Sequence, residues 1–229
     1  MFPPGGPIQT ELSLLQTGLS LLQTGLSEHA SFWPGSTLTA TQTQVDSHNN
    51  AMLSEWPTWT LCRQLAFMAH LIWESGGLRF TVEQDTAKRN NCQCCQLAPP
   101  SCATCQTCAT DGKQFHGGGH VQLSHCHNHL ACGNARKING DPNCFCNNPD
   151  IVAVNCAWDA SAWCFETNVP GTTGAFGLST KAIDGEMECL PKVTTNNCVG
   201  STPQKRHQIF KVLADAVGVT GCSEVGCHN

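Results

Sequence analysis

The sequence predicts a mainly α-helical (α+β) domain with a short β-hairpin region and disulfide bonds. An apolar residue recurs every three or four positions in two sets: Leu61, Leu65, Met68 and Ile72, and Ile209, Val212, Leu213, Ala216 and Val217. This spacing gives a helix one apolar face to bury. Few segments other than 78–83 alternate with the period of two that a half-buried strand shows. Seventeen cysteines add the expectation of disulfide bonds.

Residues 1–59 differ in composition from residues 60–229, and we predict a boundary between them. The first segment holds no Lys or Arg and is rich in Ser, Thr, Gln, Gly and Pro. Its LSLLQTG sequence at 12–18 repeats at 19–25, but a glycine in each of only two copies disfavours a helix. We expect a mostly disordered tail. The segment lacks the basic start and unbroken apolar stretch of a signal peptide.

Charge and length exclude some classes of protein. The 229 residues leave room for one domain with a core and an appendage. A net charge of −5 with only 13% charged residues offers no basic patch for nucleic acid or an anionic membrane. No apolar run reaches the length of a membrane span. We expect a monomer without nucleic-acid or membrane partners.

The cysteine content favours an extracellular protein over one from a reducing cytosol. The count is odd, so at least one cysteine is free or pairs between chains. Cys102, Cys105 and Cys108 are spaced like metal ligands, but the surrounding pattern is irregular for a tetrahedral zinc site. A cysteine-rich structural or zinc-binding protein therefore remains an alternative.

Two glutamates lie on either side of a predicted turn. Ser75-Gly76-Gly77 is expected to end the helix at 61–72, because glycine readily adopts the left-handed conformation of a helix C-cap. Glu74 would then lie on the last helical turn and Glu83 on the polar side of a strand at 78–83. Two carboxylates across one cleft are what glycoside hydrolysis requires, one as acid and one as base. The alternative is a pair of surface glutamates.

Five ordered motifs and a closing helix extend this interpretation. They are IWESGGLRFTVEQ (72–84), KQFHGGGHVQLSHCHN (113–128), NNPDIV (147–152), SAWCF (161–165), FGLSTKAIDGEMEC (176–189) and the predicted helix at 204–219. The first resembles the H-E-S/T-G-G-x-x-F/Y-x-x-E segment of family 19 glycoside hydrolases, the lysozyme-like chitinases. The others resemble that family's motifs in the family's order. The resemblance covers about residues 61–229.

The resemblance implies a two-lobed lysozyme-like chitinase domain and a role for each matching residue. Glu74 matches the general acid, Glu83 the general base and Ser124 the hydroxyl that helps to hold the attacking water. The sugar would be bound by Gln122, Asn128, His116, Trp163 and Asp184. Arg206 and Glu188 match the charged pair that supports the base. The resemblance also implies a disulfide from Cys189 to Cys222 or Cys227.

The implied activity is inverting hydrolysis of β-1,4-linked N-acetylglucosamine polymers. Chitin or chitooligosaccharide would be the substrate, with peptidoglycan as an alternative. Neither a metal nor an organic cofactor is required. The cysteine content leads us to expect an extracellular location.

Departures from the family pattern raise a second possibility. The chain contains no Tyr, and His116, His127 and His129 stand where the family has tyrosine. Gly118 replaces the motif's arginine, which would remove five donors and loosen its loop, and Asp184 replaces an asparagine. These changes suggest as an alternative a chitin-binding pseudoenzyme that has lost turnover.

Overall fold

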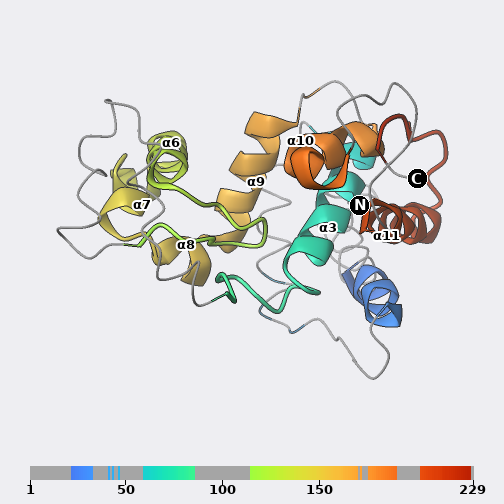
Figure 1. Cartoon of the computed structure of the whole chain (residues 1–229), viewed down its shortest axis with the longest axis horizontal. Coiled ribbons are helices and arrows are strands. Elements are labelled where there is room, and N and C mark those ends of the chain that lie inside the picture. Colours follow the sequence, from blue (N-terminus) through green and yellow to red (C-terminus); the bar gives the residue numbers. More distant parts are fainter. Residues whose placement is uncertain are drawn as a thin grey trace, which may run out of the picture. The chain divides into compact units, whose positions relative to one another are not determined.

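The computed structural model describes residues 22–32, 41, 43, 46, 59–85, 114–169, 171, 175–189 and 202–227, except the side chains of 186–188. It divides into two units: 1–70 with 171–229, called the first unit, and 71–170, called the second unit. The described elements (Figure 1) are α3 Leu61–Glu74, α6 Cys126–Arg136, η2 Ile138–Gly140, α7 Cys144–Asn147, α8 Ile151–Val154, α9 Ala157–Asn168, α10 Phe176–Glu188 and α11 Thr202–Ala216. The predicted mainly α, disulfide-containing fold is confirmed.

Helix α3 is the most deeply buried element. Leu65, Met68 and Ile72 of the predicted stripe are at most 1% exposed, whereas Leu61 is 41% exposed. Residues on the other faces of α3, including Phe67 and His70, are buried as well. A helix buried almost all round belongs to the core of a domain rather than to its surface. None of the described helices is long and apolar enough to cross a membrane.

The turn after α3 was predicted correctly, but the strand after it was not. Gly76 and Gly77 have φ angles of +59° and +77°, and the Gly77 N–H donates to Ile72 O at 2.7 Å. This is the glycine-rich C-cap that the sequence indicated. Leu78 also has a positive φ, and its N–H donates to Ser75 Oγ at 2.7 Å. The backbone at 78–80 therefore bonds back to Ser75, and a single bridge at Val82 replaces the expected strand.

The first unit contains α10 and α11, which pack against each other. The C-terminal segment runs close to the start of α10, where the Phe176 N–H donates to Ser223 O and the Cys227 N–H to Gly177 O. A Cβ on Gly177 would fall on the Gly226 backbone, so this approach requires glycine.

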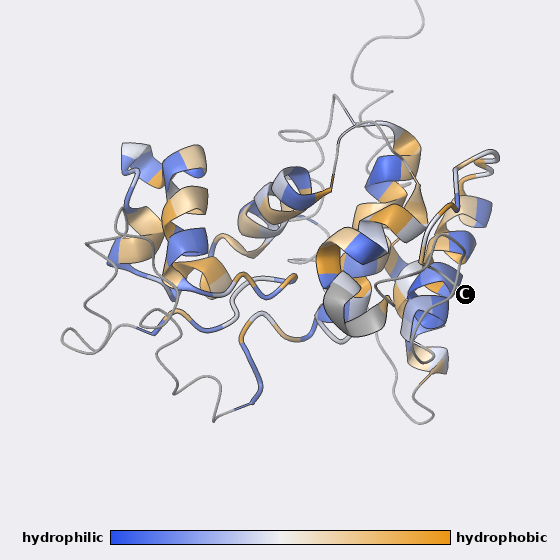
Figure 2. Cartoon of the chain, turned by 45° about the horizontal axis from the view of Figure 1, so that its top comes forward, coloured by the Kyte–Doolittle hydropathy of each residue, from blue (hydrophilic) through white to orange (hydrophobic). Residues whose placement is uncertain are grey.

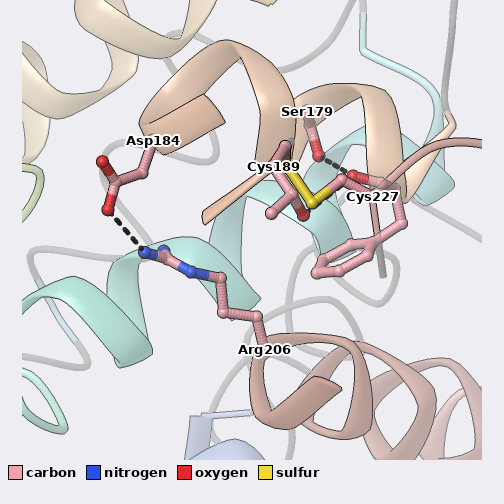
Figure 3. The surroundings of a disulfide bond; sticks show 7 residues. Ser179, Asp184, Cys189, Arg206 and Cys227 are labelled. Atoms are coloured by element: carbon pink, nitrogen blue, oxygen red, sulfur yellow. Dashed lines mark hydrogen bonds and ion pairs between the residues drawn. A yellow bond between two sulfur atoms is a disulfide. The ribbon is translucent and has the colours of Figure 1, made fainter. Parts of the chain in front are cut away.

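Two disulfides fix the C-terminal segment. Cys189–Cys227, shown in Figure 3, is one of the two pairings that the resemblance implied. Cys62–Cys222 joins the beginning of α3 to the same segment and was not predicted. Disulfide bonds are thus confirmed, with one pairing added.

The apolar face of α11 is rotated from the prediction. Ile209 and Leu213 are fully buried as expected, but Ala216 is exposed, and Phe210 and Ala214 take the expected places of Val212 and Val217 in the core. Figure 2 shows that the longer described helices carry both apolar and polar residues. The buried face also includes Arg206, which a purely apolar stripe could not reveal.

Residues 22–31 are helical, which corrects the expectation of disorder for this part of the N-terminal segment. Leu22 and Leu26 are each 1% exposed, and Lys205 of α11 lies over the Phe32 ring at 5.7 Å. Each buried leucine contributes about 1.5–3 kcal/mol, whereas a helical glycine such as Gly25 costs about 1 kcal/mol. The free energy gained by burying the two leucines is therefore larger than the cost of the helical glycine. The first repeat copy, most of the rest of 1–59 and the Cys102–Cys105–Cys108 cluster lie outside the described residues.

The second unit has its own core. Helix α6 packs against α7 and α9, and α8 packs against α9. The core comprises Leu123, Cys132, Cys144, Phe145, Val152, Cys156 and Ala160, with Ile138, Ile151, Trp163 and Cys164 packed against it. Cysteines act here as small apolar residues, and burial raises the pKa of the Cys156 and Cys164 thiols to about 11.

Candidate active site

Glu74 occupies the last position of α3 and is half-buried. The turn beyond it is held by Ser75, whose hydroxyl donates to Leu71 O at 2.6 Å. Cys164 of α9 lies near enough that the Glu74 carboxylate helps to raise the pKa of its thiol, after burial as the main cause. Glu74 is therefore held at a fixed backbone position beside α9.

Glu83 is placed by a short antiparallel contact. Val82 forms a bridge with Gly118, and the Glu83 N–H donates to Gly117 O at 2.9 Å. Gly118 in turn forms a bridge with Leu123, through N–H···O distances of 3.1 and 2.7 Å. Three short segments therefore lie side by side, although none is long enough to form a strand.

The register of these bridges brings Glu83 and Ser124 to one face. Each stands opposite Gly117, one on either side, and residues directly opposite in a ladder point the same way. Two inter-strand spacings separate them, about 10 Å between backbones. Gly117 has no side chain to fill this space, and a Cβ there would lie 2.5 Å from Gln122 Oε1. Glu83, Gln122 and Ser124 therefore surround Gly117.

Hydrogen bonds fix the polar groups on this face. The Ser124 hydroxyl donates to Gln122 O at 2.9 Å, so its lone pairs remain as acceptors. The Asn128 amide, in the first turn of α6, donates to Ser124 O at 2.9 Å. The Gln122 amide donates to Gly119 O at 3.0 Å. The structure thus brings together the predicted base, its hydroxyl and both amides.

His116 and Trp163 also belong to the second unit, but neither is fully open to solvent. His116 is 9% exposed, and its charge would affect buried His129 nearby. Trp163 is half-buried against the core. Gly118, in place of the family's arginine, is hydrogen-bonded on both its N–H and its C=O. The expected loosening of this loop stays a prediction.

Asp184, Glu188 and Arg206 lie in the first unit. Asp184 interrupts α10 with a non-helical φ of −141°. Its carboxylate faces the Arg206 guanidinium, with Oδ2 at 3.7 Å from Nη2 (Figure 3). Arg206 is only 1% exposed. Glu188 ends α10, and its side chain lies outside the described residues.

One buried polar residue of this region was missed by the sequence analysis. His70 contacts both Ser179 and Arg206 and is fully buried on α3. A histidine within an apolar helix has no local pattern that reveals partners 109 and 136 residues away. Within the described ranges, no group of three or more His, Cys, Asp or Glu side chains is arranged so that it could hold a metal ion.

Two buried histidines in the second unit are expected to make the folded protein less stable at acid pH. Burial lowers the pKa of His120 and of His129 to about 4. The unfolded chain then binds more protons between pH 6.5 and 4, so stability is lost as pH falls through this range, by about 3 kcal/mol for each ring. Urea unfolding at pH 7 and pH 4.5 measures the loss. His129→Phe should reduce it; equal losses in variant and wild type would contradict this.

Comparison with known proteins identifies related sequences. The chain is 35% identical over 166 residues to acidic endochitinase SP2 of Beta vulgaris, covering 71% of this chain and 51% of that protein. It is 33% identical over 131 residues to an endochitinase of Arabidopsis thaliana, covering 56% and 44%. The chain thus spans about half the length of the curated relatives it matches. No protein-family model matches it.

Solved structures show the same fold. Chitinase C from Streptomyces griseus aligns with a TM-score of 0.61 at 22% identity, covering 92% of this chain and 81% of that one. A bacterial family 19 chitinase aligns with a TM-score of 0.53 at 25% identity, covering 89% of each chain. A class IV chitinase from Zea mays gives 0.51 at 20% identity, covering 91% and 85%.

The helical fold with its disulfides is the fold of the solved chitinase structures, and Glu74 and Glu83 lie on either side of the turn that follows α3. The resemblance to family 19 chitinases carried by the five motifs is confirmed: the chain has their fold and is related in sequence to plant endochitinases.

Proposed function

We propose that the protein hydrolyses β-1,4-linked N-acetylglucosamine polymers with inversion at the anomeric carbon. The observation that carries this proposal is the arrangement of Glu83, Gln122 and Ser124 around Gly117, in the same unit as Glu74. The endochitinase relatives support chitin or chitooligosaccharide as substrate.

In the proposed reaction, Glu74 donates its proton to the glycosidic oxygen as the bond to the anomeric carbon breaks. Glu83 accepts a proton from the water that attacks the opposite face. Ser124 helps to hold this water, because its own proton is directed to Gln122 O and its lone pairs can accept. An inverting enzyme places its two carboxyl groups roughly 6.5–9.5 Å apart to accommodate the water.

The remaining predicted residues bind the sugar or support the catalytic base. The side-chain amides of Gln122 and Asn128 form hydrogen bonds with the N-acetyl sugar. The other proposed sugar-binding residues are His116, Trp163 and Asp184. Arg206 and Glu188 support the base through their charges. The reaction needs no cofactor, and we propose an extracellular monomer, in keeping with two disulfides in the described residues.

The stereochemistry of the product tests the mechanism. N-acetylglucosamine hexamer is incubated with the purified protein, and the first product anomers are followed by proton NMR. Initial release of α-anomer supports inversion, whereas initial β-anomer would rule it out. Peptidoglycan fragments provide the second substrate in the same assay.

A chitin-binding protein without turnover is the second candidate, and the Asp184–Arg206 ion pair favours it. Asp184 replaces an asparagine of the family motif and places a carboxylate 3.7 Å from the guanidinium that would otherwise serve the base. Retention on a chitin column without sugar release from the hexamer would select this candidate. Zinc analysis of the purified protein addresses the cysteine-rich alternative.

A further inference from the structure

His70 is the centre of a buried polar chain within the first unit. The residue is fully buried, and its ring stacks in parallel on Phe176 at 5.0 Å between centroids. Its Nε2 lies 2.8 Å from Ser179 Oγ of α10, and its Nδ1 lies 3.5 Å from Arg206 Nη1 of α11. His70 of α3 is therefore linked to both α10 and α11 through polar contacts.

The direction of each hydrogen bond follows from Ser179. Its hydroxyl donates to Phe176 O at 2.6 Å, so the oxygen is left as an acceptor toward His70. His70 must then carry its proton on Nε2, because that nitrogen is the donor to Ser179. The guanidinium of Arg206 can only donate, and the bare Nδ1 of His70 is the acceptor that faces it.

The ring must also be neutral. Burial, together with the nearby Arg206 charge, holds the pKa of His70 well below its ordinary value. A protonated ring would present a second donor and a second positive charge to a guanidinium that is itself 1% exposed. The neutral Nε2–H tautomer satisfies every contact just described.

We propose that His70 is a positioning residue: locked by Ser179 in the Nε2–H tautomer, it accepts from Arg206 Nη1 and so orients the guanidinium with Nη2 toward Asp184 and the end of α10. This inference rests on the proposed function for its effect on activity, because Arg206 acts there in support of the base. His70 touches neither substrate nor reacting atoms in this role.

The wild-type protein provides the first test, independently of activity. Nitrogen-15 NMR of the histidine rings should show His70 protonated at Nε2, bare at Nδ1 and unchanged from pH 8 to pH 5. A proton on Nδ1, or titration of this ring in that range, would overturn the proposal.

Two matched variants separate positioning from packing. His70→Asn keeps an acceptor near the Nδ1 position and loses the Ser179 contact, whereas His70→Gln keeps a group near Nε2 and loses the acceptor for Arg206. On the hexamer, kcat/KM should fall about tenfold more in His70→Gln, because a hydrogen bond to a charged group is lost. The thermal midpoints of the two variants should be similar.

Equal losses of kcat/KM in the two variants would overturn the positioning role. If the wild type shows no hydrolysis, the proposed function fails, but the inference is still tested. The Nη signals of Arg206 in nitrogen-15 spectra should then stay resolved in His70→Asn and collapse in His70→Gln. Identical Arg206 spectra in the two variants would contradict the inference.

Discussion

Replacing Glu74 by glutamine is expected to lower kcat on N-acetylglucosamine hexamer by about 10²–10⁴-fold with little change in KM, because a general acid contributes that much to the rate. Glutamine keeps the size of the side chain at the end of α3, but its amide N–H groups are too weakly acidic to protonate the leaving oxygen. The effect is therefore on the chemical step rather than on binding.

Glu83→Gln should reduce kcat over the same range, because the attacking water loses its base. Asp215→Asn provides the matched control: it removes one carboxylate from an exposed position on α11 that has no proposed part in the reaction. Activity of the control should equal that of the wild type. Retention of more than a tenth of wild-type kcat by Glu74→Gln would remove this residue from the role of acid.

The second large effect concerns stability. Loss of the Cys62–Cys222 disulfide, in a double serine variant, should lower the free energy of unfolding by about 5 kcal/mol. The bond joins residues 160 positions apart and therefore strongly restricts the unfolded chain. Cys189–Cys227, with a separation of 38, should contribute about 4 kcal/mol.

Urea unfolding of the two double serine variants beside wild type measures both losses. The more stringent prediction is that the loss of unfolding free energy is larger for the Cys62–Cys222 variant than for the Cys189–Cys227 variant. Both variants remove the same kind of bond from the same unit, so they differ mainly in the length of the loop that the bond closes. A larger loss on removing Cys189–Cys227 would mean that native contacts, rather than the loop length, decide the contribution.

Local patterns predicted the parts of the fold that local physics determines. The apolar spacing at Leu65, Met68 and Ile72 indicated α3, and Ser75-Gly76-Gly77 indicated its end, because these features depend on neighbouring residues only. The expected strand failed since alternation at 78–83 is equally compatible with a turn whose N–H groups return to Ser75. Nothing in that stretch distinguishes the two.

The features that sequence reasoning missed depend on distant residues. Cys62 has no nearby sequence that indicates Cys222, and Leu22 and Leu26 support a helix only because a core is present to bury them. The motifs indicated the residues of the candidate site, but the position of Glu83 opposite Gly117 arises from the pairing of Val82 with Gly118, which are 36 residues apart in sequence. That register was not readable from either segment alone.

The two units differ in the oxidation state of their described cysteines, and this difference affects how the protein is irreversibly inactivated at high temperature. Among the described residues, the first unit carries two disulfides, whereas the second carries thiols that include those of Cys126, Cys132, Cys144, Cys156 and Cys164. Burial keeps these groups from reacting while the unit is folded, and it raises the pKa of the Cys156 and Cys164 thiols to about 11. Once it opens, thiolates attack disulfides and the pairing is scrambled. The lifetime of the protein is then set by how often the second unit opens, a rate rather than an equilibrium.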